Sequence, residues 1–196
     1  MNVPFASRVT TAAEGLPRRR FTVAEVEGMV AAGVIGEDER VELIGGELVP
    51  MSPKGLRHEV VKTALLDRWI RIRPDECRLT PETTFRLSAD TYLEPDVVIY
   101  SRSTGLKCLT GPSALLVVEI ADFSLRCDMG RKAALYASFG VRELWVVDAV
   151  RLTTRTFGAP TERGYAEKRD YRAAERIIPM LAPAEFGIAF SELKLA

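Results

Sequence analysis

Histidine and cysteine are scarce in this chain, with one histidine and three cysteines among 196 residues. Because His58 stands alone, no zinc site built from three histidines can form, and a histidine base has a single candidate. The cysteines, Cys77, Cys108 and Cys127, include no CxxC pair, which argues against both a thiolate zinc knuckle and a disulfide framework. No GxSxG motif marks a nucleophilic serine, so a serine or cysteine hydrolase fits poorly.

The chain also lacks a surplus of charge of either sign, since 27 Lys and Arg residues balance 27 Asp and Glu residues. Proteins that bind nucleic acid over their whole surface usually carry excess positive charge, so this balance argues against that class. No apolar run approaches the ~20 residues of a membrane span, and the N-terminal segment lacks the layout of a secretory signal. We therefore expect a cytoplasmic protein with no membrane partner.

Residues 1–20 are predicted to form a poorly ordered arm that ends in the basic run Arg18–Arg20. This run is interpreted as a solvated tail in preference to a nucleic-acid contact. Residues 21–196 contain no internal repeat or low-complexity linker and are long enough for one hydrophobic core. The chain is thus predicted to be a single domain preceded by an arm.

Hydrophobic periodicity in this domain alternates between helical and strand patterns. Thr22 and Glu25 form a capping-box pattern for a short helix up to residue 32, and Gly45-Gly46 marks the turn of a hairpin over 41–51. Further helices are predicted over 56–72 and 128–139, strands over 77–87, 95–100, 114–121 and 143–148, and an antiparallel meander after 148. Strand, helix and strand over 114–148 predict a parallel pair, so the fold class is mixed α/β.

Three charged residues interrupt the apolar pattern in one neighbourhood. Asp96 follows Pro95 at the start of the strand DVVIY, and Glu119 lies near the end of ALLVVEIA, where an unpaired carboxylate is costly. On a helical wheel at about 100° per residue, Lys132 falls in the apolar arc of its helix whereas Arg131 falls outside it. Because a βαβ connection keeps the helix beside its own strand, Lys132 is predicted to point toward the sheet near Glu119.

Two carboxylates at neighbouring strand ends with an inward lysine suit phosphodiester hydrolysis. Carboxylate oxygens hold Mg²⁺ or Mn²⁺, which polarises a phosphate and lowers the pKa of a bound water. The lysine would position that water or neutralise the charge of the transition state. A structural alternative stays open, in which Asp96 is a turn residue and Glu119 pairs with an arginine or with Lys132.

Three stretches of the chain resemble the PD-(D/E)XK nuclease superfamily: VELIGGELVPMSPKGLRHEVV, LEPDVVIY and LLVVEIADFSLRCDMGRKAALYASFGVRELWVVD. They are similar in particular to the Uma-type family of restriction endonucleases, from residue 21 to about residue 150. The resemblance implies a restriction-endonuclease-like fold, with a mixed central sheet flanked by helices and an antiparallel C-terminal meander. It also implies an endonuclease that hydrolyses phosphodiester bonds, in DNA, with Mg²⁺ or Mn²⁺ as cofactor.

The motif residues carry over one by one. Pro95-Asp96 matches the PD and Glu119 the (D/E), so Asp96 and Glu119 would bind the metal. The simplest form of the motif would place a lysine where Ala121 stands, whereas the resemblance places it at Lys132, in a D-x-G-x-K pattern on the following helix. The resemblance thus implies that Asp96, Glu119 and Lys132 are catalytic.

His58 and Glu47 belong to the N-terminal pattern of the same family and are predicted auxiliary residues. The alternatives are a surface position for His58 and an ordinary hairpin position for Glu47. Tyr136, one turn beyond Lys132, is predicted to pack in the core with a partner for its hydroxyl.

The leading hypothesis is therefore a metal-dependent endonuclease. The alternative is a catalytically silent nucleic-acid-binding or assembly module that keeps the nuclease fold. Restriction enzymes commonly act as dimers, so the resemblance also favours a homodimer. Balanced net charge is compatible with a basic rim around an acidic centre, for which the candidates are Arg57, Lys62, Arg68, Arg71, Arg73, Arg126 and Arg131.

Overall fold

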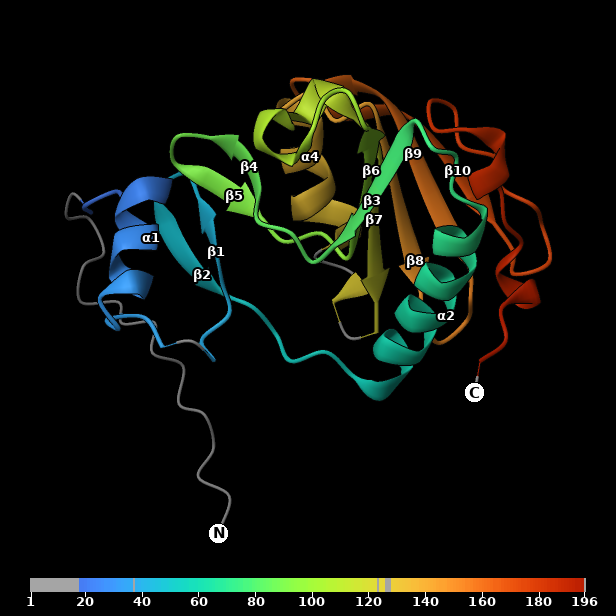
Figure 1. The fold of residues 1–196 in the computed structure, drawn as a ribbon, viewed down its shortest axis with the longest axis horizontal. Helices are drawn as coiled ribbons and strands as arrows, with labels where there is room; N and C mark the ends of the chain where they lie inside the picture. The colour runs from blue at the N-terminus through green and yellow to red at the C-terminus, as the bar shows by residue number, and fades with distance from the viewer. Residues whose placement is uncertain (1–17, 37, 123, 126–127, 196) are drawn as a thin grey trace, which may run out of the picture.

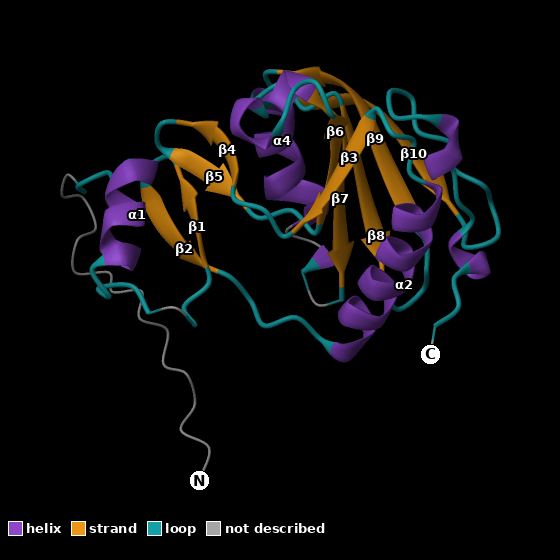
Figure 2. Ribbon diagram, in the orientation of Figure 1, coloured by secondary structure: helices purple, strands orange, loops and turns teal. Residues whose placement is uncertain are grey.

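A computed structural model describes residues 18–36, 38–122, 124–125 and 128–195 of the chain. The predicted arm therefore lies outside the described residues except at Arg18, Arg19 and Arg20, and so do Arg126 and Cys127. Figures 1 and 2 show two β-sheets side by side, with helices packed against each. This arrangement confirms the mixed α/β class.

The larger sheet has six strands in the order β10-β9-β8-β7-β6-β3. Its strands are β3 (Cys77–Pro81), β6 (Val97–Ser101), β7 (Ala114–Ala121), β8 (Glu143–Asp148), β9 (Thr154–Thr161) and β10 (Gly164–Tyr171). The predicted parallel pair is confirmed, since β7 and β8 run parallel while all other neighbours in this sheet are antiparallel. β7 lies near the centre and is almost entirely buried, as its apolar sequence predicts.

Helices cover both faces of the larger sheet (Figure 2). On one face, α2 (Leu56–Ile72) packs Val61, Leu65 and Trp69 into a core that also contains Trp145 of β8. On the other face, a π-helical turn η4 (Asp128–Lys132) leads into α4 (Ala133–Ser138), whose Tyr136 is fully buried. Short 3-10 turns complete the structure as η2 (Leu106–Cys108), η3 (Gly111–Ser113), η5 (Ala184–Phe186) and η6 (Phe190–Glu192).

The smaller sheet has four strands in the order β2-β1-β5-β4. It lies on the left in Figure 1, where its strands are blue and green. Its strands are β1 (Val41–Ile44), β2 (Glu47–Pro50), β4 (Phe85–Ser88) and β5 (Thr91–Leu93), and α1 (Val23–Ala31) packs on it. The predicted capping box of α1 and the β1–β2 hairpin are both confirmed. The hairpin turn needs its two glycines, because both have positive φ.

The single strand predicted over 77–87 is wrong. The chain leaves the larger sheet after Pro81, passes through Glu82 at a φ of 45°, and enters the smaller sheet as β4. Apolar residues on either side of the break, Leu79 and Phe85, give this stretch the sequence pattern of one strand. In the structure they pack into two different cores. The C-terminal meander is confirmed as a β9–β10 hairpin that begins at Thr154, later than the predicted start at residue 151.

Candidate functional site

Antiparallel pairing of β6 and β7 places Asp96 beside Glu119. Val97 at the start of β6 is opposite Val118 near the end of β7, so the residue before β6 reaches the end of β7. Asp96 Oδ2 accepts a hydrogen bond from the backbone N–H of Ile120 at 2.7 Å. Both carboxyl groups are buried, at 2% exposure for Asp96 and 4% for Glu119. The structure thus brings together the two carboxylates that the sequence singles out.

Lys132 lies beside Glu119, as the helical wheel predicts. Its Nζ is 3.4 Å from Glu119 Oε1, 2.9 Å from Glu42 Oε1 and 4.0 Å from Asp128 Oδ1. Tyr136 donates its hydroxyl to the same Glu119 oxygen at 2.6 Å, which confirms the predicted hydroxyl partner. The lysine ammonium is therefore held among three carboxylates from β1, β7 and η4.

Burial dominates the protonation of this cluster. Loss of solvent raises the pKa of Glu119 to about 8, since Lys132 offsets only part of the cost and neighbouring carboxylates add to it. Burial alone would lower the pKa of Lys132, but Glu119 and Glu42 outweigh it and raise that pKa. Burial and Glu119 likewise raise the pKa of Tyr136, which keeps its hydroxyl a donor. The cluster therefore carries more buried acid than one lysine neutralises.

Glu42 was missed by the sequence reasoning. It lies on β1, is 4% exposed, and accepts a hydrogen bond from the backbone N–H of Glu94 at 3.1 Å as well as binding Lys132. A signal was present, because Glu42 is an acidic residue inside the otherwise apolar strand VELI, the same anomaly that marks Glu119. Glu42 ties the smaller sheet to the helix that carries Lys132.

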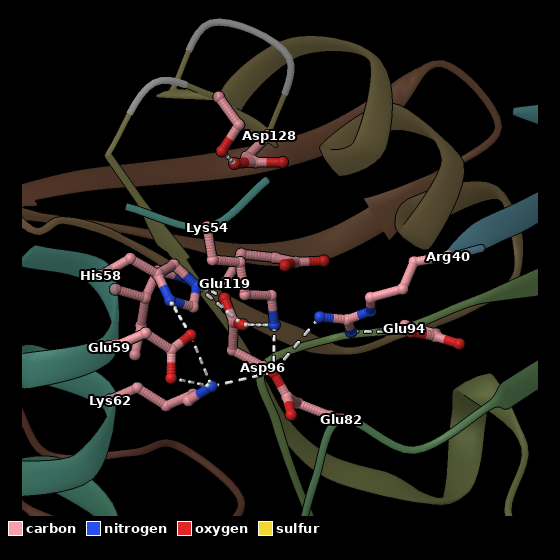
Figure 3. Close-up of polar contacts among 12 residues, drawn as sticks. Arg40, Lys54, His58, Glu59, Lys62, Glu82, Glu94, Asp96, Glu119 and Asp128 are labelled. Atoms are coloured by element: carbon pink, nitrogen blue, oxygen red, sulfur yellow. Dashed lines mark hydrogen bonds and ion pairs between the residues drawn. The ribbon is translucent and has the colours of Figure 1, made fainter. Parts of the chain in front are cut away.

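The second oxygen of Asp96 belongs to a closed ring in which acidic and basic side chains alternate (Figure 3). Asp96 Oδ1 lies 2.8 Å from Lys54 Nζ and 2.9 Å from His58 Nε2. From there the ring continues through Glu59, Lys62 and Glu82 back to Lys54. His58, predicted as auxiliary, is 4% exposed and contacts Asp96 directly, so it does not have the surface position that was its alternative.

Glu82 stabilises the folded state through this ring. Lys54 and Lys62 outweigh the effect of partial burial and lower the pKa of Glu82 from 4.5 to about 2. Since the folded pKa is below the unfolded value, the contribution is present above pH 4.5 and is lost as the pH falls toward 2. Because Glu82 is 35% exposed, solvent screening reduces that contribution to about 1 kcal/mol.

We expect Glu82→Gln to remove this pH-dependent stability. Urea unfolding of both proteins between pH 6 and pH 2 measures it as a difference in free energy that shrinks on acidification. A difference that stays constant across this range would contradict the assignment. Asp90→Asn serves as a control, because Asp90 is outside the ring and its side chain hydrogen-bonds only Ser88 and Thr91 among the described residues.

Glu47, the other predicted auxiliary residue, is not brought to the site. It lies on β2 with a side chain that is 53% exposed, 3.8 Å from Arg18. The predicted basic rim is also reduced: Lys62 is buried in ion pairs and Arg68 pairs with Glu192. The sequence shows that these cations lie along one helix but not which of them already have an acidic partner.

A cavity of about 520 Å³ opens over these residues. Its walls come from both sheets, from the segment 50–55 and from the loop after β7, and they include Glu42, Glu94, Asp96, Glu119, Asp122, Asp128, Lys54, His58, Arg131 and Lys132. Oxygen donors dominate this set, which suits a hard cation such as Mg²⁺ or Mn²⁺. Within the described ranges no three His, Cys, Asp or Glu side chains form a ready-made ligand set. Mg²⁺ commonly uses one or two carboxylates plus water and substrate phosphate, so Asp96 and Glu119 fit it.

Comparison with known proteins shows the family and the fold of this chain. A family model described as Uma2, "Putative restriction endonuclease", matches residues 26–191. The chain belongs to the Uma2 family. The resemblance seen in the motifs is thereby confirmed, and it extends through the C-terminal hairpin. No curated protein matches the chain.

A solved structure shares the fold of this Uma2 chain. It is described as a "putative nuclease belonging to DUF820 from Anabaena variabilis ATCC 29413". The two superpose with a TM-score of 0.64 at 14% sequence identity, over 88% of this chain and 96% of the other. At this identity the likeness shows the fold alone, and it confirms the predicted fold class. Separately, none of the described helices has the length and apolar character to cross a membrane.

Proposed function

We propose that this Uma2 protein is an endonuclease that hydrolyses phosphodiester bonds in DNA with Mg²⁺ or Mn²⁺ as cofactor. The observation that carries the proposal is the meeting of Asp96, Glu119 and Lys132 in one cavity, from three elements of a chain in a family described as restriction endonucleases. The proposed homodimer and cytoplasmic location remain predictions.

The roles of the residues follow from their contacts. Asp96 and Glu119 would hold the cation, which when bound polarises the phosphate and supplies a more acidic water. Ile120 fixes the orientation of Asp96 through its backbone N–H, and Tyr136 does the same for Glu119 through its hydroxyl. Lys132 keeps its positive charge through the physiological pH range, since neighbouring carboxylates raise its pKa, and it offsets negative charge that builds on the phosphate.

Incubation of the purified protein with supercoiled plasmid tests this function. We expect nicked and linear products with Mg²⁺ or Mn²⁺ and none after addition of EDTA, because the carboxylates alone supply no electrophile. Restoring Mn²⁺ in excess of EDTA should restore cleavage. An intact plasmid in every metal, together with DNA binding that is indifferent to metal, would favour the silent binding module instead.

A further inference from the structure

The connection between the two sheets brings a second lysine to the metal-binding carboxylate. Residues 51–55 join β2 to α2 with neither helix nor strand, and Lys54 on this segment lines the cavity. Its Nζ contacts Asp96 Oδ1, which His58 also contacts, while the other oxygen receives Ile120 N–H. A cation that binds Asp96 through Oδ1 must therefore compete with Lys54 as well as with His58.

The backbone that carries Lys54 is held less firmly than that of the other two lysines of the site. The N–H groups of Ser52, Lys54 and Gly55 donate no backbone hydrogen bond within the described residues, and the Lys54 side chain is 15% exposed, against 13% for Lys132 and 9% for Lys62. Lys132 by contrast is enclosed by three carboxylates on regular structure. A long unbranched stem lets the Lys54 ammonium change partners without moving the helix.

If Lys54 moves away from Asp96 and Glu82, Glu82 still has positively charged partners. Glu82 keeps Lys62 at 2.8 Å and Arg40 at 3.7 Å, so it is not stranded without a counter-ion. A divalent cation at Asp96 would repel the nearby ammonium, whereas a phosphate in the cavity would attract it. Lys54 and Arg131 are the cavity's cations outside the Lys132 cluster in the described part of the chain, apart from His58 if protonated.

We propose that Lys54 is a substrate-binding residue that exchanges partners during the reaction cycle. It neutralises Asp96 until a divalent cation binds there, and then it contacts a phosphate of the DNA. This inference rests on the proposed function, since it takes Asp96 as a metal ligand. It adds Lys54, which lies on the connection between the sheets, to the residues that contact the substrate. It also makes metal binding and DNA binding interdependent.

The variant Lys54→Met separates this role from a structural one, because the two expected effects have opposite signs. Calorimetric titration of the full chain with Mn²⁺ should show binding at least about 3-fold tighter than in the wild type, as competition for Oδ1 is removed. Anisotropy of a labelled duplex in Ca²⁺, with the duplex checked for integrity, should show weaker binding. Loss of one phosphate contact should also reduce the slope of log K against log salt by about 0.9.

Lys62→Met is the matched control, since Lys62 shares Glu82 with Lys54 but does not contact Asp96. It should not tighten Mn²⁺ binding or change the salt slope. Wild-type protein gives a second measurement: acetylation of Lys54 by acetic anhydride, followed by mass spectrometry, should increase with Mn²⁺ and decrease again with DNA. Lys62 and Lys132 in the same digest should not follow this course.

Three outcomes decide between the proposals. Opposite shifts in Mn²⁺ and DNA affinity, with Mn²⁺-dependent labelling of Lys54, support the exchange. Mn²⁺ binding that requires Asp96 but is unchanged or weakened in Lys54→Met, with labelling indifferent to Mn²⁺, overturns the exchange and leaves the proposed function intact. Absence of Mn²⁺ binding to the wild type overturns both.

Discussion

Asp96→Asn is expected to lower the rate of DNA cleavage by about 10³-fold or more. The substitution keeps the size of the side chain but removes the charge that would hold the cation. A bound metal stabilises the transition state by several kcal/mol, and each 1.36 kcal/mol is worth a factor of ten in rate. Initial rates of plasmid cleavage at saturating Mg²⁺ measure the loss, and calorimetry with Mn²⁺ should show that metal binding falls with it.

Lys132→Met should lose about 10²- to 10³-fold in kcat, as expected for removal of one group that stabilises transition-state charge. This variant leaves Glu42, Glu119 and Asp128 without their shared cation, so its rates are compared at temperatures where circular dichroism shows it folded.

Asp67→Asn is the control for Asp96→Asn, since Asp67 is exposed on α2. Full activity in Asp96→Asn would remove this residue from the mechanism.

Trp69→Ala is expected to lower the free energy of unfolding by about 3–5 kcal/mol, the range for removing a buried aromatic side chain. Trp69 is fully buried on α2, with its ring 6.2 Å from Trp145 and 5.6 Å from Phe186, both in edge-on geometry. Its loss would leave a cavity where α2, the larger sheet and the C-terminal segment meet. Urea unfolding monitored by circular dichroism gives the value.

Two variants bracket this result. Ile70→Ala, at a neighbouring position that is 53% exposed, should change stability by less than about 1 kcal/mol. Trp69→Phe should cost clearly less than Trp69→Ala, because the indole N–H it removes has no hydrogen-bond partner among the described residues. A Trp69→Ala protein within about 1 kcal/mol of the wild type would show that the core around Trp69 repacks.

The placement of Asp96, Glu119 and Lys132 was predictable because each depends on local or nearly local order. Strand periodicity located Glu119, and a helix that follows directly on its strand located Lys132. The partners of Glu42 and Lys54 were not predictable in the same way, although the apolar strand around Glu42 does signal that its carboxylate is buried. Their roles depend on how the smaller sheet and its connection dock against the larger sheet, and neither periodicity nor a motif carries that information.

The limits of the fold prediction have a similar origin. Strand patterns report alternating burial but not which core receives each side chain, so the passage from β3 to β4 between sheets looked like one strand. The hairpin, the helix over 56–72 and the strand over 114–121 agreed closely with the structure. Turn glycines mark the hairpin, Gly55 and Pro74 flank the helix, and a mostly apolar run marks the strand.

The ion pair between Glu42 and Lys132 affects when the candidate site can form during protein synthesis. These residues are far apart in the chain and on different layers, so their contact forms only after the smaller sheet, the larger sheet and α4 have all assembled. Such long-range contacts form late in folding because loop closure must precede them. A nascent chain therefore lacks the assembled cluster of Lys132 and its carboxylates, and the DNA cleavage that we propose would be confined to the finished fold.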